Sequence, residues 1–149
     1  MIDAFLDELS NSGDLTEDHL ERLHTVCAKN QQRFIDAVCE TKLVTEGQAL
    51  QALGRLYAIP MAHDIGVDLE MGPGLDALEK DFATHISRRF LKTYCMVPVI
   101  RPDETPLIVL NDPGELNIVD DVVKMTGIGE YGLALAEKSK IIMIINMLY

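Results

Sequence analysis

The chain has 149 residues, enough for one domain or for two small ones that share a core, and 48% of them are hydrophobic. Its 24 acidic residues outnumber its 13 Lys and Arg residues, and the formal net charge of −11 argues against nucleic acid and anionic lipid as partners. Three cysteines without metal-ligand spacing predict reduced thiols in a cytosolic protein. No stretch has the composition of a signal peptide or the length of a membrane span, so we expect no direct membrane insertion.

Residues 1–60 form a predicted helical block that contains an internal repeat. Apolar residues recur there every three or four positions, which predicts helices over residues 2–9, 17–28, 33–40 and 46–57. The segment Leu15-Thr-Glu17 returns 29 positions later as Val44-Thr-Glu46, a period typical of one small helical unit used twice. Each threonine is a predicted N-cap, and Thr45 with Gln48 has the spacing of a capping box.

The pattern changes after residue 60. Residues 61–78 are rich in glycine and predict an extended connector, with a short helix near its end. In residues 79–149 we expect helices over 83–92, 115–125 and 137–148, and strands over 95–100, 107–110 and 131–135. The predicted fold class is therefore α+β: a helical block with an internal repeat, then an α/β sandwich-like subdomain whose small antiparallel sheet is packed by helices.

One glycine motif resembles a nucleotide-binding sequence. Gly127-Ile-Gly129-Glu-Tyr-Gly132 fits GxGxxG, which in dinucleotide-binding proteins follows a strand and opens a helix. Here it follows a predicted helix, so we interpret it as a helix stop and a turn. The chain has no GxxxxGK loop for a triphosphate, and His24 with Cys27 lacks a second pair of metal ligands. We expect no catalytic role, no cofactor and no metal.

Several short motifs, in their order and spacing, carry a family resemblance. They are Leu43-Val-Thr-Glu46, Ala58-Ile-Pro60, Ser87-Arg-Arg-Phe90, Met96-Val-Pro-Val-Ile100, the strand that ends in Asp112-Pro113, and Thr126-Gly127. Together they resemble the N-terminal domain of type II secretion and type IV pilus assembly ATPases, over nearly the whole chain. The resemblance implies a non-catalytic docking or regulatory domain that links a C-terminal motor ATPase to the cytoplasmic domain of an inner-membrane platform protein. It places the domain in the cytoplasm, peripheral to that membrane.

One branch of that family binds cyclic di-GMP through two tandem units, which resemble the two copies of the repeat. Each unit of that branch begins Arg-Leu-Gly, has a later glycine and closes with Gln. The first unit of this chain keeps Gly13 but begins Ala4-Phe-Leu6 and ends on Cys27, and the second keeps Arg33 but has Lys42 for a glycine and ends on Leu56. Arg33 is thus the remnant of a cyclic di-GMP site, and we expect weak binding or none.

Two alternatives to the motor-docking hypothesis remain, a cyclic di-GMP sensor with a modified site and a stand-alone adaptor. For docking, the acidic first turns of the repeat helices are the predicted partner-binding residues, because the repeat gives them no other role: Glu17, Asp18, Glu21 and Glu46. Their partner should be basic. The first helix, which precedes Gly13, could also exchange between two chains and give a helix-swapped dimer. The cluster Arg88, Arg89 and Lys92 can grip a phosphate or a carboxylate, although a solvated helix face is commoner.

Overall fold

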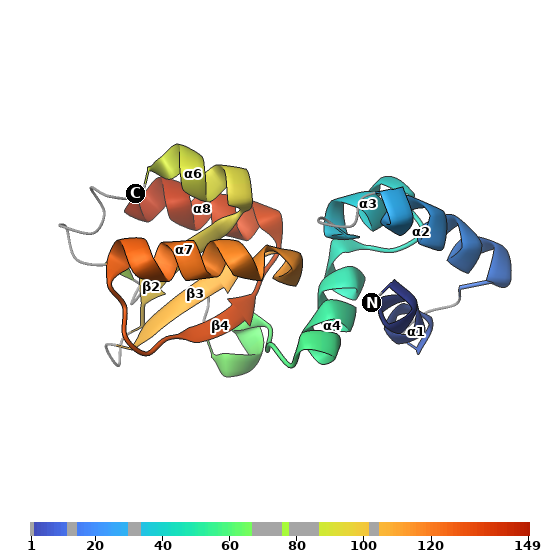
Figure 1. The fold of residues 1–149 in the computed structure, drawn as a ribbon, viewed down its shortest axis with the longest axis horizontal. Coiled ribbons are helices and arrows are strands. Elements are labelled where there is room, and N and C mark those ends of the chain that lie inside the picture. The colour runs from blue at the N-terminus through green and yellow to red at the C-terminus, as the bar shows by residue number, and fades with distance from the viewer. Residues whose placement is uncertain (1, 12–14, 30–33, 67–75, 78–86, 102–104) are drawn as a thin grey trace.

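A computed structural model describes residues 2–11, 15–29, 34–66, 76–77, 87–101 and 105–149. The molecule is elongated, with the helical block at one end of the long axis and the sheet with its helices at the other (Figure 1). This arrangement confirms the α+β class and the order of its two halves. Within the described residues, no helix is both long enough and apolar enough to cross a bilayer.

The helical block consists of four helices, which agree closely with the predicted ones. They are α1 (Ile2–Asn11), α2 (Glu17–Lys29), α3 (Phe34–Glu40) and α4 (Glu46–Tyr57). Thr45 caps α4 as predicted: its hydroxyl accepts from the amide of Gln48 at 3.2 Å, and its amide donates to the Gln48 side chain at 2.9 Å. Thr16 begins α2 with the same pair of hydrogen bonds, in which His19 takes the place of the glutamine. Both copies of the repeat therefore begin their second helix in one way.

The repeat also organises the core of the helical block. Phe5 and Phe34, which occupy equivalent positions in the two copies, stack with ring centroids 5.6 Å apart and an interplanar angle of 7°. Both rings are buried, as are Leu9 and its repeat equivalent Val38. Two units that each bury only one face thus complete a shared core. The carboxylate of Glu8 holds Arg55 at 2.8 Å, which ties α1 to α4 within one chain.

The second half is a sheet of four strands in the order β1-β2-β3-β4. The strands are β1 (Asp76–Ala77), β2 (Met96–Ile100), β3 (Pro106–Leu110) and β4 (Gly132–Leu135). The predicted hairpin is confirmed, since β2 and β3 are antiparallel with Met96 opposite Leu110. The sheet as a whole is mixed, because β4 lies parallel to β3. The strand itself was predicted over residues 131–135, but the prediction of an antiparallel sheet is wrong for its direction. A helix joins β3 to β4, and a helical crossover returns the chain in the same direction.

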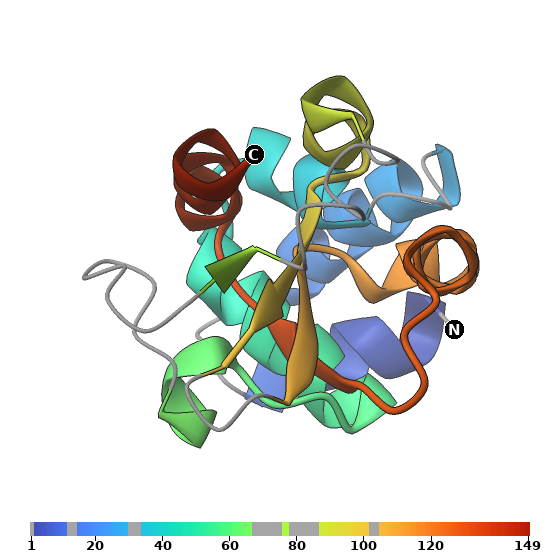
Figure 2. The same ribbon diagram turned by 90° about the vertical axis from the view of Figure 1, so that its left-hand side faces the viewer.

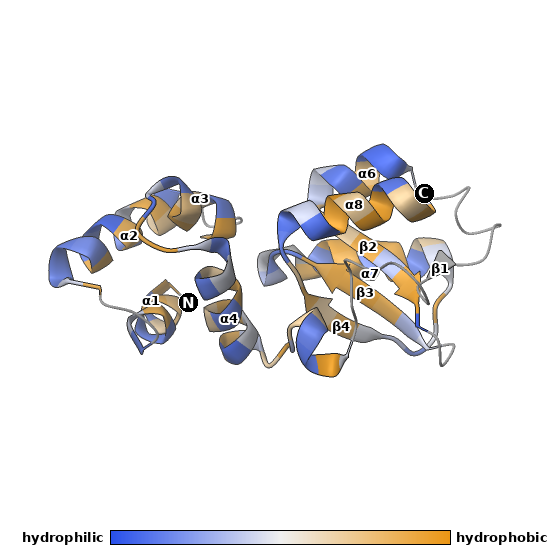
Figure 3. Ribbon diagram, turned by 180° about the vertical axis from the view of Figure 1, so that it is seen from behind, coloured by the Kyte–Doolittle hydropathy of each residue, from blue (hydrophilic) through white to orange (hydrophobic). Residues whose placement is uncertain are grey.

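Three helices cover the sheet, namely α6 (Arg88–Tyr94), α7 (Leu116–Thr126) and α8 (Lys138–Leu148). Figure 2 shows α6 and α8 on one side of the strands and α7 on the other. The strands are correspondingly buried on both faces and appear as a continuous apolar layer in Figure 3. The closing helix is further fixed by the Tyr149 hydroxyl, which donates to the carbonyl of Pro98 at 2.7 Å.

The segment that follows α4 is attached to the sheet, which corrects the prediction of an extended connector over its described part. The amide of Leu135 donates to the carbonyl of Pro60 at 2.9 Å, and Met61 bridges to Leu135 alongside β4. A short 3-10 helix, Ala62–Ile65, follows, and β1 pairs with β2 from within the same segment. Most of the short helix expected near residue 78 lies outside the described residues.

Candidate functional site

The positions that resemble a cyclic di-GMP site are altered or buried where the structure describes them. Gly13 and Arg33 lie outside the described residues. Ala4, which stands where that branch has its Arg, is half-buried, and Cys27, which stands where it has Gln, is fully buried. Neither side chain offers the charged or amide group with which a guanine edge would pair. The first unit therefore keeps the helices of a binding unit without its polar groups.

Lys42 shows why a glycine suits this place in the second unit. Its φ is +59°, in the left-handed region that costs most side chains about 1–2 kcal/mol. The turn is held by amides that donate back along the chain, from Lys42 to the Cys39 carbonyl at 3.1 Å and from Leu43 to the Thr41 hydroxyl at 3.2 Å. The backbone therefore keeps the glycine conformation, while an exposed lysine side chain occupies the space that a glycine leaves open.

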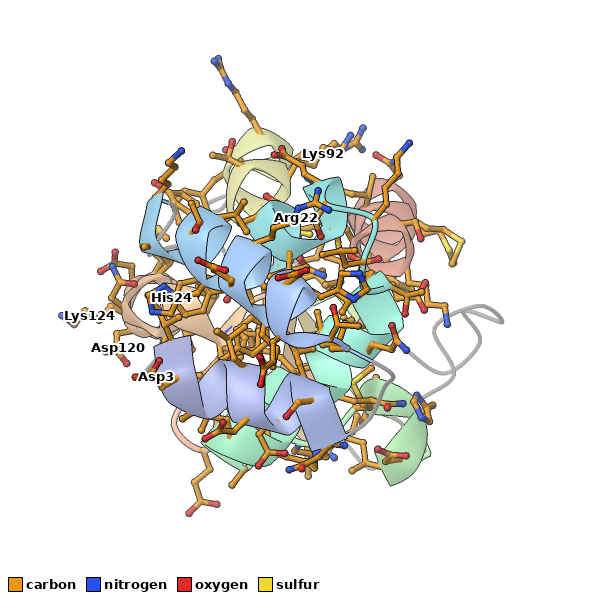
Figure 4. All side chains as sticks on the ribbon, turned by 90° about the vertical axis from the view of Figure 1, so that its right-hand side faces the viewer. Asp3, Arg22, His24, Lys92, Asp120 and Lys124 are labelled. Carbon is orange, nitrogen blue, oxygen red and sulfur yellow. The ribbon has the colours of Figure 1, made fainter. Side chains whose placement is uncertain are left out.

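Three of the four predicted partner-binding residues form one exposed surface. Glu17, Asp18 and Glu21 lie in the first turns of α2, at the end of the molecule far from the sheet (Figure 1). Figure 4 faces this end and shows Asp3 of α1 close to His24 of α2, whose Nε2 lies 3.8 Å from a carboxylate oxygen of Asp3. We call Glu17, Asp18 and Glu21 the acidic turn.

Glu46, the fourth predicted residue, is placed elsewhere and has a role within the fold. Its carboxylate oxygen Oε2 accepts from Asn111 Nδ2 at 3.0 Å and from the backbone amide of Lys138 at 3.1 Å. Lys138 is the first residue of α8, so the carboxylate of Glu46 meets the positive end of that helix. The assumption that all four acidic residues are free for a partner is therefore wrong for Glu46.

Asp112 makes a second link between the two halves. It is 3% exposed, and its carboxylate accepts from the amide of Ile35 in α3 at 3.3 Å and from the amide of Gly114 at 2.9 Å. Asn111 beside it is fully buried and donates to the Ala136 carbonyl as well as to Glu46. We call the contacts of Glu46, Asn111 and Asp112 the seam. Charge-assisted hydrogen bonds of this kind are stronger than neutral ones, and here they hold the two halves together.

The seam also affects nearby titrating groups. Burial, together with the negative charge of Asp112, raises the pKa of the Cys27 thiol to about 11. Burial and then Asp112 also raise the pKa of the Tyr57 hydroxyl. Burial, with Glu46 and Asp36 nearby, raises the pKa of the Cys39 thiol. Such thiols stay protonated at neutral pH and are poor nucleophiles.

The structure bears on two of the chemistries that the sequence raised, metal binding and dinucleotide binding. Among them, no three His, Cys, Asp or Glu side chains are grouped as metal ligands. The GxGxxG motif stands between α7 and β4. Gly127 ends the helix with a φ of +69°, and its amide donates a hydrogen bond to the Val123 carbonyl. That context confirms its interpretation as a helix stop, since no helix N-terminus follows to receive a pyrophosphate.

The seam was not foreseen from the sequence. Its one signal was Asn111-Asp112-Pro113 at the end of an apolar strand, which had been interpreted only as a strand end. A polar pair directly after a buried strand must find partners in the interior, and here the partners come from α3 and α4.

Comparisons with known proteins agree with this architecture. Residues 71–149, just over half of the chain, match the MshEN domain family. Among solved structures the chain is similar to MshE with cdg, or cyclic di-GMP, at 16% identity and a TM-score of 0.69 over 97% of this chain and 98% of that one. It is also similar to the N-terminal domain of XpsE, at 21% identity and a TM-score of 0.60 over 99% and 93% of the two chains. A search of curated proteins gives no match.

Proposed function

Because the chain belongs to the MshEN domain family, the N-terminal domains of type II secretion and type IV pilus assembly ATPases, we propose that it is a non-catalytic docking domain of such a motor. In this proposal the domain joins the motor ATPase to the cytoplasmic domain of an inner-membrane platform protein. It works at the cytoplasmic face of that membrane and reaches it through its protein partner.

One observation carries the proposal: the likeness to the XpsE N-terminal domain extends over both halves, so the chain has the whole fold of such a domain. The exposed side chains suit docking, because the described surface offers charged helix faces. The same likeness would also suit a stand-alone adaptor, which would act without a motor ATPase.

The acidic turn is the proposed docking surface. Its carboxylates are exposed, lie at one end of the molecule and are far from the seam that holds the fold together (Figure 1). Carboxylates placed this way speed the approach of a basic partner surface, and the encounter weakens as salt screens the charges. Glu46 is left out of this surface because the seam uses its carboxylate.

A titration of the chain with the cytoplasmic domain of its platform protein tests the proposal. We expect binding that weakens with added salt, and a Kd about tenfold higher for the variant with Glu17→Lys and Asp18→Lys. The matched control is Asp120→Lys with Asp121→Lys, which makes the same charge change at exposed positions of α7. Equal loss in both variants would mean that net charge, rather than the acidic turn, governs binding.

Cyclic di-GMP is the ligand of the relative MshE, and we propose that this chain binds it weakly or not at all. Support comes from two apolar residues, the half-buried Ala4 and the buried Cys27, at positions where that branch of the family has Arg and Gln. Each lost hydrogen bond to a desolvated ligand costs about 1–3 kcal/mol, so several losses would make binding too weak to measure at micromolar concentrations. Calorimetry with cyclic di-GMP measures this directly.

A further inference from the structure

Helix α6 carries a positive charge that contrasts with the rest of the chain. Three of its side chains, Arg88, Arg89 and Lys92, are basic, and none is acidic. The chain as a whole has a net charge of −11. Arg88 and Arg89 are exposed, and Lys92 is half-buried. In Figure 3 the hydrophilic α6 lies beside the more apolar α8, at the outer side of the sheet half.

The position of these charges does not help the helix to form. Arg88 and Arg89 are the first two residues of α6, where the helix dipole favours negative side chains and disfavours positive ones. The first turns of α2 and α4 follow the favourable pattern, with Glu17, Asp18 and Glu46. Helix stability therefore gives no reason for two arginines at the start of α6.

The three basic side chains also have no ion pair with any residue that the structure describes. The described ion pairs lie elsewhere, between His24 and Asp3, Arg55 and Glu8, and His63 and Asp64. Together with Thr93, the basic residues line an open depression of about 520 Å³. The Thr93 hydroxyl donates to the Arg89 carbonyl at 2.8 Å within the helix.

We propose that α6 is a second docking surface, and that its occupant is an acidic segment of a partner protein. Arginine guanidinium groups form paired hydrogen bonds with carboxylates, and adjacent arginines on one helix can hold side chains along a short peptide. This surface is opposite in sign to the acidic turn and lies in the other half (Figure 1), so the two would take different segments. The inference stands on α6 alone and holds whether or not the motor-docking proposal is correct.

The size and surroundings of α6 favour a peptide over larger polyanions. A nucleic acid or an anionic membrane would extend well beyond three basic residues and meet the acidic remainder of the chain, which repels it. A short acidic segment touches only the depression. At physiological salt the screening length of about 8 Å hides most of the distant negative charge from such a segment.

Fluorescence anisotropy with a labelled peptide of alternating Glu and Ser tests the proposal on the full chain. A peptide with Gln in place of each Glu is the control probe. We expect the Glu peptide to bind at physiological salt and to be released at about 1 M salt, where the screening length falls to about 3 Å, and the Gln peptide not to bind. The variant with Arg88→Glu and Arg89→Glu should weaken binding by about tenfold or more, through two lost ion pairs and the repulsion that replaces them.

A matched control carries Arg22→Glu and Lys124→Glu, which change the net charge equally at exposed positions outside α6; both residues are labelled in Figure 4 with Lys92. It should bind the peptide within about twofold of the unchanged chain, as expected for distant screened charges. The α6 variant should also melt no lower than the unchanged chain, because glutamates suit the first turn of a helix. Loss of binding with unchanged or raised Tm separates docking from folding.

Three results would overturn the proposal. One is failure of the unchanged chain to bind the Glu peptide at physiological salt, and another is equal binding by the α6 variant. The third is stronger occupation of α6 by vesicles of phosphatidylglycerol or by a DNA oligonucleotide, each displacing the peptide, because either would make the occupant a larger polyanion. Retention of peptide binding in the presence of both supports a protein segment.

Discussion

The sheet half and the helical block of this molecule differ in what they share with the family. The sheet half lies within the span that matches MshEN domains, and its strands β2 and β3 are buried on both faces. The helical block lies outside that span and shares the fold of its relatives over the length of the chain. It retains the two capped helix starts of the repeat and the stacked Phe5 and Phe34.

The contrast shows which residues a fold of this kind depends on. The helical block needs its caps, its apolar positions and the seam, and all three are present. The polar positions of a nucleotide-binding unit contribute to a ligand rather than to the core, so the apolar Ala4 and the buried Cys27 can replace them without loss of the fold. A shared architecture can therefore persist while the chemistry of one half changes.

The largest expected effect comes from removing a stacked ring at the centre of the helical block. Phe5→Ala should lower the free energy of unfolding by about 3–5 kcal/mol, because the buried ring leaves a cavity and its partner Phe34 loses a stacking contact. Since the seam joins the halves, we expect a single denaturation transition, as for Leu107→Ala in the sheet half. A separate early transition of the helical block would show that the seam does not couple the halves.

The pH dependence of stability tests the environment of Cys27. The folded chain holds the thiol proton to a pKa of about 11, above its usual value, so the unfolded chain releases it at lower pH. Stability from this group is complete below pH 9 and is lost as the pH rises to about 11, by at most about 3 kcal/mol. Cys27→Ala should cost stability at every pH and flatten this fall. If the free energy of unfolding fell equally with pH in the unchanged chain and in the Cys27→Ala variant, Cys27 would not be the cause of the fall.

Loss of the Glu46 carboxylate should weaken the seam by a smaller amount. Glu46→Ala removes two hydrogen bonds, to Asn111 and to the Lys138 amide, and we expect a cost of about 1–2 kcal/mol. Glu46→Gln keeps an oxygen that can accept both and should cost less than half as much. Hydrogen exchange at the start of α8 should quicken in the Ala variant only; equal exchange in both variants would argue against this role for Glu46.

The smallest effect should be a gain in stability at Lys42. Lys42→Gly relieves the left-handed backbone strain, and after the entropy that glycine gains on unfolding we expect about 0.5–1 kcal/mol of stabilisation. Ala58, with a φ of +56° at the end of α4, offers a matched site where Gly should act alike. Destabilisation at Lys42 with stabilisation at Ala58 would mean that the Lys42 side chain makes contacts of its own.

Much of this fold follows from patterns within short stretches of sequence. Apolar periodicity and the threonine caps predicted the bounds of α4 without error, and branched residues around Pro98 predicted the hairpin. The parallel pairing of β4 and the attachment of Pro60 to Leu135 depend on contacts between distant segments, for which a single sequence carries no local signal.

The candidate sites likewise divide into those with a local sequence signal and those that depend on remote contacts. The charges of the acidic turn could be identified because first-turn carboxylates have a local signature. The role of Glu46 could not, because its partners Asn111 and Lys138 are remote in sequence. An acidic residue in a first turn thus has the same appearance in the sequence whether it serves a partner or the fold.

Calorimetric titration of the full chain with cyclic di-GMP tests most directly whether the helical block has kept the fold without the ligand site. We predict no measurable heat of binding at micromolar concentrations of the chain, and the same result for Arg33→Ala. Saturable binding with a low-micromolar Kd that Arg33→Ala abolishes would contradict the account, and would make the helical block a nucleotide sensor that uses a different set of contacts.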